Sequence, residues 1–96
     1  MMGIDEISYE EAKQLVEKWK GNESKLNLII NDKEEQEEFY VATVNDTIWI
    51  KNSNTVGYCI EFKKDSDFKY KLRRYENNTI LEMCSKINKY QLINNK

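Results

Sequence analysis

The amino-acid sequence predicts an α+β fold: an N-terminal helix packed on a five-stranded, mostly antiparallel sheet, with a second helix at the C-terminus. Residues 39–62 predict the centre of the sheet, because they hold three runs of β-branched and aromatic residues separated by short groups of turn formers. Residues 8–20 predict the first helix and residues 79–91 the last, because each segment joins a helix-start signal to a helical spacing of apolar residues. A chain of 96 residues predicts a single small globular domain, 1–96.

The first helix has a recognisable start and end. Ser8 and Glu11 have the S-x-x-E spacing of a capping box. Gly21 is the expected left-handed residue that ends the helix. Between these signals, apolar residues recur at intervals of three and four and predict one stripe facing the core, made by Ala12, Leu15, Val16 and Trp19.

Two segments lie between this helix and the three central strands. Residues 25–31 alternate apolar and polar side chains and predict a strand with one buried face. Residues 32–38 hold five acids and one base. Such a run predicts a solvated connection, with a helical turn as one form of it, or else an acidic surface that meets a basic partner.

The central strands allow their pairing to be predicted from their loops. A two-residue loop at Asn45-Asp46 places Val44 opposite Thr47, and therefore Ala42 opposite Trp49. A three-residue loop at 52–54 then places Ile50 opposite Val56 and Trp49 opposite Gly57.

These pairings divide the central strands into two faces, because successive side chains of a strand point to opposite sides. The face expected to form the core collects Phe39, Val41, Thr43, Ile48, Ile50, Val56, Tyr58, Ile60 and Phe62. The opposite face collects Tyr40, Ala42, Val44, Thr47, Trp49, Gly57, Cys59 and Glu61. This second face is more apolar than a hydrated face needs to be, so it predicts a cover: the C-terminal segment, a second copy of the chain, or a foreign partner.

The segment 68–75 predicts a fifth strand with Phe68, Tyr70 and Leu72 turned inward. Its other side presents Lys69, Lys71, Arg73 and Tyr75, which could follow a nucleic-acid backbone or protect an exposed sheet edge from pairing.

The last segment has two readings. A hairpin would pair Leu72 with Met83 and Arg73 with Glu82. The helix over 79–91 is preferred, because Thr79 and Glu82 have a second capping-box spacing and helical intervals separate Ile80, Met83, Cys84, Ile87 and Tyr90.

Composition excludes several classes of function. The absence of histidine removes the commonest general base and metal ligand, and three glycines without proline leave no phosphate-binding loop. We therefore predict a protein that is not an enzyme, with no catalytic residues, no metal and no cofactor. No apolar run approaches a membrane span, and the acidic N-terminus is unlike a secretory signal, so a cytoplasmic protein is expected. Cys59 and Cys84 are expected as free thiols in that reducing compartment.

Charge is unevenly distributed along the chain. Residues 1–50 hold 12 acids and 5 bases, whereas residues 51–96 hold 5 acids and 10 bases. Phage anti-defence proteins and toxin-immunity proteins, which inhibit a macromolecule by covering its surface, are often short, acidic and poor in histidine, and this chain is similar to them in general type. The predicted partner is a protein, with a homodimer as a further expectation, and the predicted contact residues are Glu34, Glu35, Glu37, Glu38, Tyr40 and Trp49.

The alternative function is a nucleotide- or nucleic-acid-binding module. It would use the basic strand 68–75, with Lys69, Lys71, Arg73 and Tyr75 as ligand contacts. The low density of basic residues and the net charge of −2 argue against it.

Overall fold

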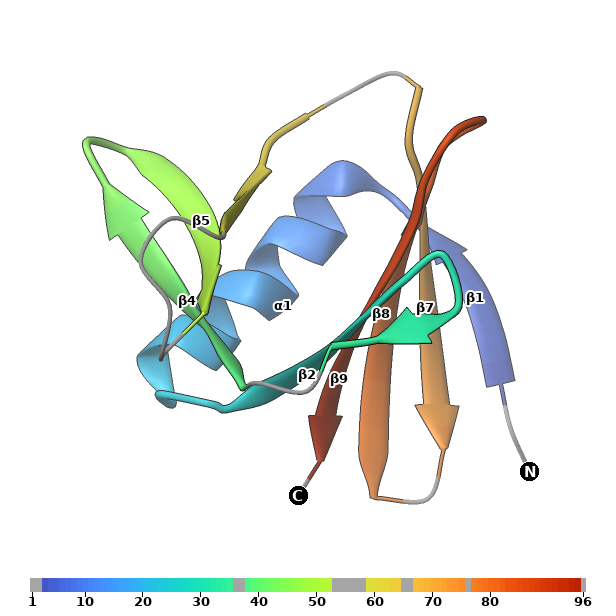
Figure 1. Cartoon of the computed structure of the whole chain (residues 1–96), viewed down its shortest axis with the longest axis horizontal. Coiled ribbons are helices and arrows are strands. Elements are labelled where there is room, and N and C mark those ends of the chain that lie inside the picture. The colour runs from blue at the N-terminus through green and yellow to red at the C-terminus, as the bar shows by residue number, and fades with distance from the viewer. Residues whose placement is uncertain (1–2, 36–37, 53–58, 65–66, 76, 96) are drawn as a thin grey trace.

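A computed structural model describes residues 3–35, 38–52, 59–64, 67–75 and 77–95 (Figure 1). Within these residues, nine strands form one antiparallel sheet and a single helix packs against it. The elements are β1 (Gly3–Ile7), α1 (Tyr9–Gly21), β2 (Leu26–Ile30), β3 (Lys33–Glu34), β4 (Phe39–Val44), β5 (Thr47–Asn52), β6 (Cys59–Phe62), β7 (Lys69–Tyr75), β8 (Asn78–Cys84) and β9 (Lys89–Asn95). The prediction of a five-stranded sheet with a C-terminal helix is therefore wrong.

The order of strands in the sheet is β1-β7-β8-β9-β2-β4-β5-β6, with β3 paired to β2. Figure 1 shows α1 between the two halves of this sheet, with β4, β5 and β6 on one side and β1, β7 and β8 on the other. The joint between the halves is narrow, because β2 and β4 pair only through Leu26 and Phe39.

Helix α1 forms as the sequence predicts. Ser8 caps it: the Glu11 amide donates to Ser8 Oγ at 3.1 Å, and the Ser8 amide donates to Glu11 Oε1 at 3.2 Å. Ala12, Val16 and Trp19 are buried in the core. The left-handed residue after the helix is Glu23, with φ 53°, and not Gly21, which is the last residue of α1.

The hairpin of β4 and β5 confirms its predicted register. Asn45 and Asp46 have φ of 51° and 65°, the positive values that a type I′ turn requires. Val44 lies opposite Thr47, and Ala42 lies opposite Trp49.

The pairing of β5 with β6 differs from the prediction by four residues. Ile50 lies opposite Ile60, where Val56 was expected, and Trp49 lies opposite Glu61, where Gly57 was expected. The expected three-residue loop and both expected partners fall wholly or partly in 53–58, outside the described residues. Because four is even, the shift leaves every side chain of β6 on its predicted face, and Phe62 is buried.

The segment expected to be a C-terminal helix is the hairpin of β8 and β9. Leu81, Met83 and Leu92 are buried in strand geometry, whereas Ile87, expected in the helical stripe, is 84% exposed in the turn. The Ser85 hydroxyl stabilises this turn by accepting hydrogen bonds from the amides of Ile87 and Asn88. The apolar spacing of this segment fits both the period of a helix and the two-residue period of a strand, and the strand forms because it buries these residues in the sheet.

The sheet also corrects the predicted place of β7. This strand lies between β1 and β8, so its cations do not protect an exposed edge. Its partner β1 was not predicted, because two acids among its five residues, Asp5 and Glu6, obscure the strand signal. Leu72 of β7 lies opposite Leu81 of β8, whereas the hairpin alternative in the sequence analysis paired it with Met83. This difference of two residues is even, so each side chain stays on the face that the alternative gave it.

Aromatic side chains close the core between the two halves of the sheet. Phe62 of β6 stacks on Tyr9 of α1, with ring centroids 5.4 Å apart, and lies 6.2 Å from Tyr70 of β7. Tyr70 also meets Tyr9 edge to face at 5.8 Å. The meander, which is β4, β5 and β6, thus shares one core with the rest of the sheet, although backbone pairing joins the two parts at a single point.

Truncation of Leu92 to alanine tests the β8–β9 hairpin. Leu92 is fully buried, so Leu92→Ala should lower the free energy of unfolding by about 2–5 kcal/mol. Ile87→Ala is the matched control and should change it by less than about 0.5 kcal/mol. Urea denaturation followed by tryptophan fluorescence measures both. A loss at Ile87 equal to that at Leu92 would contradict the hairpin.

Candidate partner-binding surface

The described start of the acidic run, residues 32–35, folds as a hairpin and not as a helical turn. Asn31 and Asp32 have φ of 50° and 69°, and β3 pairs back onto β2. Pairing continues at the Glu35 amide, which donates to the Leu28 carbonyl at 2.8 Å. The predicted acidic contacts therefore have different surroundings: Glu34 and Glu38 are exposed, Glu35 is half-buried, and Glu37 lies outside the described residues.

The apolar face opposite the core is open to solvent in the described part of the meander. Tyr40 is 37% exposed and Val44 47% exposed. Ala42 and Trp49 are half-buried, and Cys59 is exposed. We call this face the outer patch, defined as Tyr40, Ala42, Val44, Trp49 and Cys59. The C-terminal segment does not cover it, because β9 lies within the sheet between β8 and β2.

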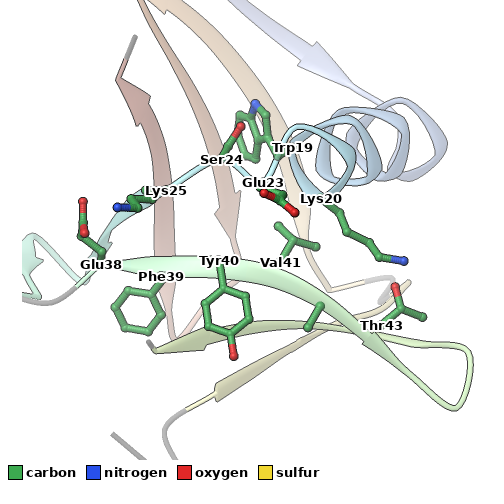
Figure 2. A pocket seen from close by; sticks show the side chains of 11 residues that line it. Trp19, Lys20, Glu23, Ser24, Lys25, Glu38, Phe39, Tyr40, Val41 and Thr43 are labelled. Atoms are coloured by element: carbon green, nitrogen blue, oxygen red, sulfur yellow. The ribbon is translucent and has the colours of Figure 1, made fainter. Parts of the chain in front are cut away.

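A groove borders the outer patch where β4 leaves β2 (Figure 2). It measures about 660 Å³ and lies between the end of α1 and β4. Its walls carry both charges: Lys20, Glu23 and Lys25 on one side, and Glu38 on the other. Of the predicted contact residues, the structure brings Glu38 and Tyr40 together here, whereas Trp49 belongs to the outer patch alone.

The edge of β4 facing this groove lacks a strand partner beyond Phe39. In an antiparallel hairpin with a two-residue loop, the residues flanking the loop form a hydrogen-bonded pair and every second residue repeats it. Val44, Ala42 and Tyr40 therefore bond to β5. Val41 and Thr43 direct their amides and carbonyls toward the groove, and in the described structure no strand pairs with them there.

The basic strand does not present its predicted ligand residues together. Arg73 Nη2 lies 3.6 Å from Glu82 Oε1, and the Gln91 amide donates to the same oxygen at 3.3 Å. Glu82 is only 3% exposed, so Arg73 neutralises a buried carboxylate. The side chain of Tyr75 lies outside the described residues.

The two lysines of the basic strand instead line a separate hollow. Lys69 and Lys71 meet Lys86 and Asp67 around a space of about 840 Å³. Lys69 and Lys86 are exposed, and Lys71 is half-buried. This hollow is the part of the predicted nucleotide or nucleic-acid site that the fold assembles.

One titration shift belongs to a turn and not to either hollow. A hydrogen bond from Lys89 to Asp32, with Nζ–Oδ1 at 3.0 Å, raises the pKa of the lysine above its usual 10.5. A lysine whose pKa is raised in the folded protein stabilises the fold when the pH is below its ordinary pKa. This contribution is lost as the pH rises through the raised pKa. The contact is exposed and joins the β2–β3 turn to β9.

The described residues hold no group of three side chains of the His, Cys, Asp or Glu type that could bind a metal ion. The one helix in the described residues, α1, lacks the length and apolar character needed to cross a membrane. No protein-family model, curated protein or solved structure matches the chain.

Substitution of Arg73 tests whether it is structural. Arg73→Met keeps the aliphatic stem but leaves the Glu82 carboxylate without its cation, and should lower the free energy of unfolding by about 1–3 kcal/mol. Lys69→Met removes a neighbouring exposed cation and should change it by less than about 0.5 kcal/mol. Urea denaturation compares the two, and equal stabilities would show that the pair contributes nothing.

Proposed function

We propose that the protein is a non-enzymatic binding protein that neutralises a protein partner by covering part of the partner's surface with the outer patch. The observation that carries this proposal is the exposure of Tyr40 and Val44 beside Trp49, on a face that no described element of the chain covers. Of the three covers expected from the sequence, the fold removes the C-terminal segment and leaves a second copy or a foreign partner.

The composition of the outer patch suits a protein interface. Interfaces concentrate binding energy in a few aromatic and other apolar side chains at their centre, surrounded by a polar rim. Tyr40 and Trp49 supply aromatic surface on adjacent strands, and Ala42 leaves space beside Trp49, which lies opposite it. Such a surface excludes water from its centre without any rearrangement of the sheet.

Acidic residues at the border of the outer patch indicate the chemistry of the partner. Glu61 lies opposite Trp49, Glu38 precedes β4, and Asp46 stands in the turn beyond Val44; all three are exposed. Lys51, which is half-buried between Tyr40 and Cys59, is the cation within this border. The partner that fits is an apolar protein surface with a mainly basic rim.

A further feature supports the proposal. Both cysteines are free thiols and Cys59 is exposed, which suits a reducing cytoplasm. We place the protein with the phage anti-defence and toxin-immunity type on its general character alone.

Replacement of Val44 by aspartate tests the outer patch. Val44→Asp puts a charge into the apolar surface without entering the core, so the fold should persist while capture of the partner from host lysate falls at least tenfold. Lys69→Glu, on the distant basic strand, should retain capture. Quantitative mass spectrometry of immobilised wild type and variants measures this, and equal capture by Val44→Asp and wild type would contradict the proposal.

The hollow formed by Lys69, Lys71 and Lys86 supports a second candidate, the binding of a nucleotide or nucleic acid. Phosphate contacts weaken steeply as salt rises. Oligonucleotide binding at low salt that Lys69→Glu abolishes would favour this candidate over the first.

A further inference from the structure

We propose that the open edge of β4 pairs with the same edge of a second copy, so that two chains join their sheets about a two-fold axis at Ala42. This inference goes beyond the binding of a foreign partner, because it uses the strand edge and the groove and leaves the outer patch available. It rests on four observations.

The first observation is the absence of charge along β4. Its six residues, Phe39–Val44, include no charged residue, glycine or proline. The other open edges in the described structure are protected: β1 carries Asp5 and Glu6, β6 is short and carries Glu61, and β3 has two residues, both charged. An uncharged edge strand of high β-propensity is a template for pairing with another chain.

The second observation is the backbone available on that edge. Val41 and Thr43 direct their peptide groups into the groove, at the position that a longer β2 would occupy. If two copies of β4 run antiparallel about Ala42, Val41 of each lies opposite Thr43 of the other. Each such pair exchanges two hydrogen bonds.

The third observation is that this register is self-complementary in its side chains. Tyr40 of each copy lies opposite Val44 of the other on the same face, so the exposed large apolar residues of β4 contact one another side by side while the face itself stays open. Ala42 meets its own copy on the axis, in a non-hydrogen-bonded pair where side chains are closest. A small side chain fits that position.

Neighbouring registers are worse. An axis one residue earlier sets Phe39 opposite Thr43, although the edge of Phe39 already pairs with Leu26. An axis one residue later sets Val41 opposite Asn45, which has φ 51° and belongs to the turn. Only the axis at Ala42 uses the open residues and no others.

The fourth observation concerns size. Stable interfaces draw on about 20–30 residues per partner. The groove, including the open edge of β4, is lined by 11 residues, which is about half of that number. We therefore expect a reversible dimer that forms as concentration rises, with the two outer patches side by side on one surface.

Complementary charges at Ala42 test the axis. Ala42→Lys and Ala42→Glu each place like charges against one another in a dimer, so each variant alone should stay at 11.5 kDa by sedimentation or light scattering. Wild type should rise toward twice that mass over a concentration series. An equimolar mixture of the two variants should recover the dimer, because only at the axis does residue 42 meet itself.

Thr43→Pro tests the backbone bonds separately. It removes an amide that points to the groove and not to β5, so the hairpin should persist, checked by circular dichroism, while dimerisation is lost. Thr43→Ser keeps the amide and should dimerise like wild type.

Two results would overturn the proposal. A wild type that remains monomeric would leave the edge to a strand from another protein, and a dimer that the charge mixture fails to restore would use a different surface. In either case capture of a foreign partner that remains sensitive to Val44→Asp would still stand, so the two proposals fail separately.

Discussion

One helix has to cover the inner face of the whole sheet, and this constraint shapes the molecule. Eight neighbouring strands laid flat would span roughly 34 Å at about 4.8 Å per strand. Helix α1 is 13 residues long, which is about 20 Å, and its diameter is about 10 Å. A flat sheet would therefore leave much of its apolar face exposed to solvent. The sheet instead encloses α1, so that Leu28, Leu81 and Leu92 from one half and Ile48 and Ile50 from the other belong to one core.

Enclosing the helix requires a break in the sheet, and the break creates the candidate site. Strand β2 begins at Leu26 because residues 22–25 are needed to return from α1. Beyond Phe39, the edge of β4 that faces away from β5 therefore has no strand partner in the described structure. Phe62, Tyr9 and Tyr70 hold the meander against the rest of the molecule through side chains. The groove and the open edge are thus consequences of the way the core is closed.

The sequence predicts faces better than it predicts pairings, and the reason is the two-residue period of a strand. The β5–β6 pairing was displaced by four residues and the β7–β8 alternative by two, yet Phe62 and Tyr70 are both buried as expected. The length of the connection between β5 and β6 could not be predicted from the sequence, because the turn formers that begin at Asn52 mark the end of one strand but not the start of the next. The C-terminal helix was wrong for another reason: Thr79 and Glu82 match a capping box by coincidence, and only pairing of β9 with β2 distinguishes the alternatives.

The same distinction explains which parts of the candidate site were predictable. Tyr40 and Trp49 were assigned to the solvent face by alternation alone, and that face is open in the described meander. Arg73 was grouped with Lys69 and Lys71 by the same alternation, but its role depends on Glu82, a residue then assigned to a helix. The open edge of β4 was invisible because it depends on where β2 starts, which is a property of the α1–β2 connection. Its one local signal is the uncharged run Phe39–Val44: a strand interior can lack charge because neighbours cover it, whereas an edge that lacks charge needs another strand.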